Sequence, residues 1–119
     1  MAQTIFERYG GFSTFSKVVS AFYDKILESP ITSRYFTNID MRNLVDHQTK
    51  FVASVVGGPA SYSNEHIARI HGPLKIDEDA FTEMSALLKE TLEDFGVADA
   101  DVHAVCQEIL NRKHFVVAR

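Results

Sequence analysis

The stretch DMRNLVDHQTKFVASVVGG, residues 40–58, decides the fold of this chain. Its apolar residues recur at three- and four-residue steps after Asp40, a residue type favoured at helix N-caps, and Gly57-Gly58 ends the pattern. The inner stripe of this predicted helix reads Leu44, His47, Gln48, Phe51 and Val55. An unpartnered polar group buried in such a stripe costs about 1–3 kcal/mol. His47 and Gln48 therefore either line a partly wet groove or bond to nearby backbone, or they belong to a ligand site.

The rest of the chain has the same helical period and no convincing strand. Further helices are predicted from Thr4 to Tyr9, from Phe12 to the break at Ser29-Pro30, from about Asn64 to His71, from an Asp77 cap to Gly96, and from an Asp99 cap onward. Their inner faces comprise Phe12, Phe15, Val19, Phe22 and Ile26; Ile67 and Ile70; Phe81, Met84, Leu88, Leu92 and Phe95; and Val102, Val105, Cys106, Ile109 and Leu110. These patterns predict an all-α bundle of about five packed helices.

Composition restricts the function classes. A chain of 119 residues, 45% of them hydrophobic, suffices for one compact domain over residues 1–119. With 12 basic against 16 acidic side chains and no basic run, a nucleic-acid surface is not expected, and the expected partner is a small molecule. The chain carries a single cysteine, no secretory pattern at its start and no apolar run of the ~20 residues that span a bilayer. We expect a cytoplasmic monomer without a membrane association.

A third polar residue favours the ligand site. Tyr23 lies on the inner side of its predicted helix beside Phe22, so its hydroxyl can meet Gln48 and His47 among phenylalanines. Apolar walls with a few convergent polar groups are more typical of a ligand site than of a core. His47 and His71, set into two helices that the double glycine separates, would place two imidazoles at one apolar cleft. That arrangement indicates a haem pocket.

Several motifs in order carry a resemblance to a known family. They are IFERYGG (5–11), FY (22–23), YFTNIDM (35–41), HQTKF (47–51), VGG (56–58) and HGPLKI (71–76), continuing to Phe81. Together they cover nearly the whole chain, which resembles the group I truncated haemoglobins and, among these, the cyanobacterial-type members. The resemblance implies a truncated globin, a two-over-two helical sandwich around haem b.

The resemblance also implies roles for individual residues. His71 matches the proximal histidine that ligates the haem iron, and Tyr23 and Gln48 match the distal pair that donates hydrogen bonds to a bound diatomic ligand. Phe36 matches an aromatic residue that packs on the haem plane, and Leu44 occupies the distal position where many globins place histidine or glutamine. The remaining expected contacts of the haem are Phe51 and Leu74.

Two further histidines distinguish the cyanobacterial-type members. The residue matching His47 can ligate the iron itself, which would make the resting haem six-coordinate through His47 and His71; otherwise His47 bonds a haem propionate or water. The residue matching His114 can bond covalently to a haem vinyl group, although the flanking Asn111-Arg112-Lys113 and Phe115-Val116 do not clearly repeat the family's sequence. The alternative for His114 is an exposed histidine in a charged patch.

The implied function is reversible binding of oxygen, nitric oxide and carbon monoxide. The implied reaction is oxidation of nitric oxide to nitrate, or handling of reactive oxygen and nitrogen species more generally. No glycine-rich dinucleotide fingerprint is present, so turnover as a dioxygenase would need a separate electron donor or reductase. Four alternatives stay open: oxygen storage or delivery, a haem-based redox sensor or electron-transfer module, a haem-free interaction domain, and, most weakly, a zinc site of two histidines.

Overall fold

Helices form almost all of the regular structure. The computed structural model describes residues 3–37, 39–58, 75–113 and 117. The helices are α1 (Ile5–Arg8), α2 (Gly11–Glu28), the short 3-10 helix η1 (Ser33–Phe36), α3 (Met41–Val55), α5 (Glu78–Asp94) and α6 (Asp99–Asn111). Within these ranges the only β-type pairing is an isolated parallel bridge between Ile76 and Val117. None of the described helices is long and apolar enough to cross a membrane.

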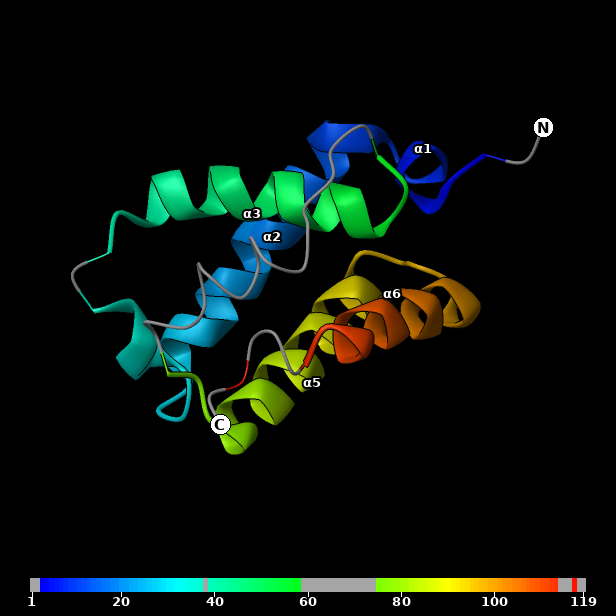
Figure 1. Ribbon diagram of the computed structural model, residues 1–119. Coiled ribbons are helices and arrows are strands. Elements are labelled where there is room, and N and C mark those ends of the chain that lie inside the picture. The colour runs from blue at the N-terminus through cyan, green and yellow to red at the C-terminus, as the bar shows by residue number, and fades with distance from the viewer. Residues whose placement is uncertain (1–2, 38, 59–74, 114–116, 118–119) are drawn as a thin grey trace.

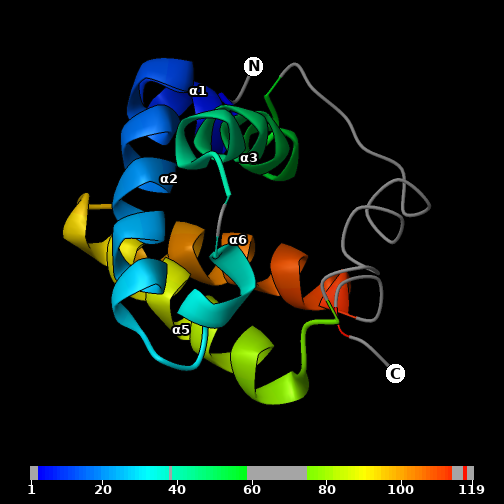
Figure 2. The ribbon, with the colours of Figure 1, turned by 90° about the vertical axis from the view of Figure 1, so that its left-hand side faces the viewer.

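The long helices form two pairs. Figures 1 and 2 show α3 alongside α2, and α5 alongside α6 beneath them. Helix α2 packs against both α3 and α5, so it joins the two layers. The predicted all-α, two-over-two arrangement is therefore confirmed.

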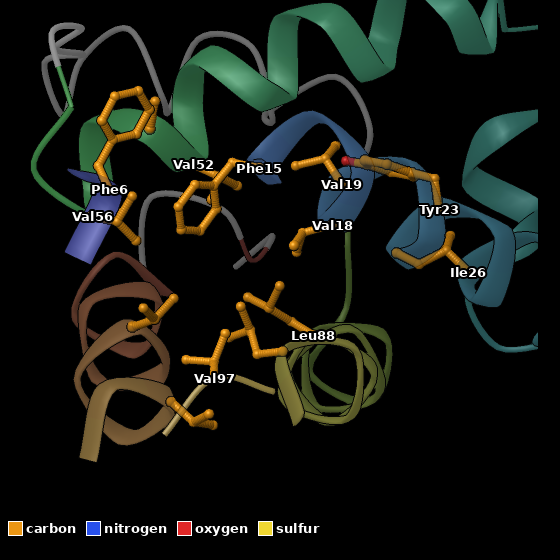
Figure 3. Packing of buried hydrophobic residues seen from close by; sticks show 14 of the residues in the cluster. Phe6, Phe15, Val18, Val19, Tyr23, Ile26, Val52, Val56, Leu88 and Val97 are labelled. Atoms are coloured by element: carbon orange, nitrogen blue, oxygen red, sulfur yellow. The ribbon is translucent and has the colours of Figure 1, made fainter. Parts of the chain in front are cut away.

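The hydrophobic core lies where α2 meets its neighbours (Figure 3). Phe15, Val18, Val19 and Ile26 are at most 1% exposed and supply the α2 contribution. Helices α3, α5 and α6 add Val52, Leu88, Leu92, Val102 and Val105, and Val56 follows the end of α3. Burying a large aliphatic or aromatic side chain contributes about 1.5–3 kcal/mol, so α2 is the element on which the packing depends most.

Aspartate side chains cap two of the three helices for which an aspartate N-cap is predicted. Asp40 accepts a hydrogen bond from the Asn43 amide at 3.3 Å, and Asp77 accepts one from the Ala80 amide at 2.8 Å. Both predicted N-caps are confirmed. The third prediction is wrong, because Asp99 is the first residue of α6 and the N-cap is Ala98, which makes no side-chain hydrogen bond.

Three apolar residues predicted to face inward are exposed. Phe12, Phe95 and Leu110 are 43%, 40% and 51% exposed, respectively. Each lies at or beside a helix end, where periodicity still assigns a face but the neighbouring helices no longer cover it. The Phe12 ring nevertheless packs edge-on against Phe6, with the centroids 4.9 Å apart.

The double glycine after α3 makes a close contact with the N-terminal helix. The Phe6 amide donates to the Val56 carbonyl at 3.0 Å, and the Gly58 amide donates to the Ala53 carbonyl at 2.6 Å. Gly57 has a φ of +87°, a conformation that glycine adopts at no steric cost. A Cβ at Gly58 would lie 2.9 Å from both the Ala53 oxygen and the Phe6 ring. The predicted end of the helix is confirmed, and the glycines also let α1 dock there.

Candidate functional site

An apolar cleft lies between the two helical layers. The free space in and directly outside the cleft amounts to about 1020 Å³, a figure that includes open solvent at its mouth. Its walls come from α2, η1, α3, α5 and α6, with aromatic and aliphatic side chains that include Phe22, Phe36, Leu44, Phe51, Phe81 and Met84. Such a slot can take a large, flat and mostly apolar ligand.

Two polar side chains from the α2–α3 layer, those of Tyr23 and Gln48, indicate the chemistry of the cleft. Tyr23 is 6% exposed, and its ring meets Phe22 and Phe36 edge-on, at centroid distances of 5.0 and 5.5 Å. Its hydroxyl forms a hydrogen bond with the side chain of Gln48 on α3. Both residues line the cleft. A phenol and an amide are thus held together in surroundings of low polarity.

Burial fixes the protonation state of the phenol. It raises the pKa of Tyr23 well above its ordinary value of 10.0, and the hydrogen bond with Gln48 opposes this shift to a smaller extent. The hydroxyl is therefore neutral near pH 7 and available as a hydrogen-bond donor. The Gln48 amide adds a second potential donor beside it.

The fold brings together five residues that the sequence singled out. Tyr23, Phe36, Leu44, Gln48 and Phe51 all line the cleft, although they come from α2, η1 and α3. The other predicted cofactor contacts, His71, Leu74 and His114, lie outside the described residues.

His47 differs from its predicted position. It is exposed and is not among the residues that line the cleft, so the expectation that it lies within the inner stripe is wrong. Leu44, Gln48 and Phe51 follow the i, i+4, i+7 spacing of one helix face, whereas His47 is displaced to the edge of that face. Its predicted role as an iron ligand stays a prediction.

Sequence reasoning missed two polar residues of the cleft. Ser85 and Arg112 both line it. A signal was present, because Ser85 stands four residues after Phe81 and Arg112 stands three after Ile109, each in the register of an apolar stripe. A pattern defined by apolar residues does not include these two side chains, because both are polar.

The residues of the cleft fit haem. A porphyrin is a broad apolar plane, and the aromatic walls would cover its faces while Tyr23 and Gln48 present donors to a small ligand at its centre. The requirement for an axial imidazole falls on His71, outside the described residues.

Comparison with known proteins identifies the family. The family model described as bacterial-like globin matches residues 4–118. The group 1 truncated hemoglobin of Tetrahymena pyriformis is 30% identical over 107 residues, covering 90% of this chain and 88% of that protein. The group 1 truncated hemoglobin of a Synechocystis strain is 27% identical over 109 residues, covering 86% of this chain and 88% of that relative.

Solved structures agree in fold. Truncated hemoglobin from Tetrahymena pyriformis in its Fe(III) form superposes with a TM-score of 0.88 at 27% identity, covering 98% of this chain and all of that one. The 2/2 hemoglobin of a Synechococcus strain, in the cyanomet state with covalently attached haem, gives a TM-score of 0.90 at 23% identity over 98% of this chain and all of that one. The second likeness concerns the fold alone. With the family model, the Tetrahymena relative and the apolar cleft in agreement, this chain belongs to the bacterial-like globins as a group 1 truncated haemoglobin, a protein that binds haem and diatomic gases.

Proposed function

We propose that this globin retains oxygen at a haem in the interlayer cleft and uses it to oxidise nitric oxide to nitrate. The observation that carries the proposal is the pairing of the buried Tyr23 with the partly buried Gln48 in an otherwise apolar wall. Retention of oxygen matters because nitric oxide must arrive before the oxygen dissociates.

The chain's own residues would hold the cofactor as the family pattern implies. His71 would supply an imidazole ligand of the iron, while Phe36, Leu44, Phe51 and Leu74 would pack against the porphyrin. When bound, haem b supplies an iron centre that takes diatomic ligands and exchanges electrons. The protein contributes positioning, exclusion of water and hydrogen-bond donors.

Tyr23 and Gln48 act as preorganised donors. The buried phenol keeps its proton, and the Gln48 amide cannot lose its hydrogens at any ordinary pH, so both can donate to a ligand that gains negative charge. Hydrogen bonds to charged groups contribute about 1.5–3 kcal/mol. Because the two donors already contact one another, little reorganisation is needed when a ligand enters.

Turnover requires an electron source. The reaction combines nitric oxide, oxygen and one electron to give nitrate, so the protein must be re-reduced after each cycle. The electron comes from a separate donor or reductase, and enzymatic activity depends on that partner. The predicted cytoplasmic location and monomeric state, with one domain over residues 1–119, belong to this proposal.

His47 provides a gate in the resting protein. We infer that the His47 imidazole, together with that of His71, would hold the haem iron in the absence of gas, so that a gas would have to displace His47. The His47 side chain is adjacent in sequence to Gln48 and exposed on α3, so turning it toward the cleft requires a change of rotamer. Affinity for gas then falls by the fraction of molecules in the closed state.

His114 extends the proposal to the cofactor bond. We propose that it forms a covalent link to a haem vinyl group in the loaded protein. Mass spectrometry of the denatured protein would detect the link as a single species with the combined mass of chain and haem. In His114→Ala the chain and the haem should appear as separate species. Separation in the unmodified protein as well would remove this part of the proposal.

Oxygen release tests the central proposal. Tyr23→Phe should speed oxygen dissociation from the reduced protein about tenfold to a hundredfold, because a charge-assisted hydrogen bond is lost. Gln48→Leu should act in the same direction. Stopped-flow mixing with carbon monoxide reports the rate, and Tyr9→Phe is the matched control, since Tyr9 bonds Asp101 outside the cleft. Equal rates for all four proteins, or failure of the oxygenated protein to convert nitric oxide to nitrate, would contradict the proposal.

The visible spectrum tests the gate separately. Low-spin bands in ferric and ferrous protein are expected, and His47→Leu should convert them to high-spin bands and speed gas binding. An unchanged spectrum would show that His47 is not an iron ligand. The electron-transfer alternative predicts rapid reduction with poor gas binding, and the storage alternative predicts oxygen retention without nitrate formation.

A further inference from the structure

Arg112 is the one charged side chain among the described residues that line the cleft. It is the C-cap of α6, and its side chain is 26% exposed. Facing an apolar cleft is unfavourable for a guanidinium unless the charge has a partner. Its neighbours along the same wall, Ile109 and Met84, offer none.

The existing partners of Arg112 use only part of its donor capacity. One nitrogen, Nη1, donates to the Glu108 carbonyl oxygen at 2.7 Å and to Glu108 Oε2 at 2.9 Å. A guanidinium has five N–H donors in a planar fork, and within the described part of the chain nothing accepts from Nη2 or Nε. The Glu108 side chain is 47% exposed, so solvent screens this pair and the carboxylate is easily replaced.

We propose that Arg112 binds a carboxylate of the haem and thereby orients the porphyrin in the cleft. Haem b combines an apolar plane with two carboxylates, which need a cation or water. A planar guanidinium fork binds a carboxylate through two parallel hydrogen bonds, which fixes direction as well as position. This inference rests on haem occupying the interlayer cleft.

The position of Arg112 in the fold gives the contact a distinct role. Tyr23 and Gln48 belong to the α2–α3 layer, whereas Arg112 ends α6 in the opposite layer. Arg112 therefore holds the edge of the cofactor from the other layer, away from the hydrogen bond between Tyr23 and Gln48. Loss of Arg112 should therefore loosen the cofactor.

Lys113 provides a matched control. It is the adjacent cation, but its Nζ pairs with Glu78 at 2.6 Å and lies 5.9 Å from the centroid of the Phe81 ring. It is not among the residues that line the cleft. A general effect of positive charge at the end of α6 would therefore appear in both Arg112→Gln and Lys113→Gln.

The test compares two cofactors. The full-length protein, Arg112→Gln and Lys113→Gln are each loaded with haem b and, separately, with its dimethyl ester, which has no ionised carboxylate. Transfer to an excess of an acceptor apoglobin reports cofactor release. With haem b, Arg112→Gln should release it about threefold to tenfold faster, as expected for a partly exposed charge-assisted contact. With the diester, release from Arg112→Gln and from the unmodified protein should be equal.

The same acceleration with both cofactors would overturn the proposal, because Arg112 would then act through packing. No acceleration with haem b would overturn it too. Arg112→Lys should restore part of the effect, since it keeps the charge without the fork. This outcome is separate from that of the proposed function. Failure of the proposed function would appear as unchanged oxygen dissociation in Tyr23→Phe and Gln48→Leu, and it would leave the comparison of the two cofactors intact.

Discussion

Tyr23 shows how burial makes a weak acid into a permanent donor. The side chain is 6% exposed and surrounded by aromatic edges, so an anionic phenolate would lose most of its solvation. The hydrogen bond with Gln48 recovers only part of that loss. A phenol in solution begins to ionise near pH 10, but Tyr23 keeps its proton beyond that point.

The Tyr23 phenol should therefore titrate above the ordinary range of a tyrosine, because its pKa is raised. The chain has four tyrosines, and NMR of protein with ¹³C at the tyrosine Cζ, in the ferrous carbon monoxide form, follows each one. We expect the Tyr23 signal, assigned by its absence in Tyr23→Phe, to show no ionisation near pH 10.0 because its pKa is raised. A Tyr23 signal that moves at the ordinary pH would contradict the burial argument.

The raised pKa of Tyr23 also determines how its contribution to the stability of the fold changes with pH. Since the folded-state value exceeds the unfolded one, Tyr23 stabilises the fold fully below about pH 10 and loses that contribution as pH rises above it. The difference in urea midpoint between the unmodified protein and Tyr23→Phe should thus shrink at alkaline pH. A difference that grows with pH would reverse the assignment.

The sequence could predict some site residues and not others for a physical reason. Tyr23 and Gln48 can be predicted as site residues because a polar residue in an apolar stripe needs a partner. His47 satisfied the same criterion yet is exposed, because one position along a helix rotates a side chain by about 100° and the edge of a stripe is not sharply defined. Arg112 escaped notice because its stem occupies an apolar position while its head is charged.

At the scale of elements, the ends of helices depend on contacts as well as on caps. Thr4 and Glu7 form a capping box on α1, and the Tyr9 hydroxyl donates to Asp101 at 2.6 Å, which attaches α1 to the start of α6. That contact helps to explain why α6 begins at Asp99 without a side-chain N-cap. Helix caps can be predicted from the sequence, but hydrogen bonds between residues as far apart in the chain as Tyr9 and Asp101 cannot.

The turn after α3 allows a test of close approach. Gly58→Ala should lower the free energy of unfolding by about 1–3 kcal/mol, because the new Cβ would meet the Ala53 carbonyl and the Phe6 ring at 2.9 Å. Urea unfolding followed by circular dichroism measures the change. The contact joins α1 to α3, so the lost stability belongs to the fold rather than to the cleft.

Gly96→Ala is the control for backbone strain. Gly96 has a φ of +77° and open space around its Cβ position, so alanine there should cost only the strain of about 1 kcal/mol. A larger loss at Gly96 than at Gly58 would show that conformation, and not contact, dominates at the two glycines.

At the scale of the whole molecule, the pairing of layers could not be read from periodicity. Each helix shows an apolar stripe, but several packings would bury the same stripes. The order and spacing of the motifs identified the two-over-two arrangement through family resemblance, and the packing of α2 against both α3 and α5 confirms it. The cleft follows from that pairing, because two layers that are joined mainly along α2 leave space between their other helices.

Haem should therefore stabilise the molecule by binding the folded state. Linkage gives about 2.7 kcal/mol at a free haem concentration of 100 times Kd, and a further ~1.4 kcal/mol for each tenfold increase. We expect Tm to rise with the logarithm of haem concentration, and the rise to be largely lost in His71→Ala if that residue supplies the axial ligand. His103→Ala is the matched control, because His103 is exposed on α6 and does not line the cleft. If His71→Ala keeps the full rise, as His103→Ala should, the axial assignment is wrong. If the haem-free proteins already differ in Tm, His71 also contributes to the fold, and only the haem-dependent increment measures ligation.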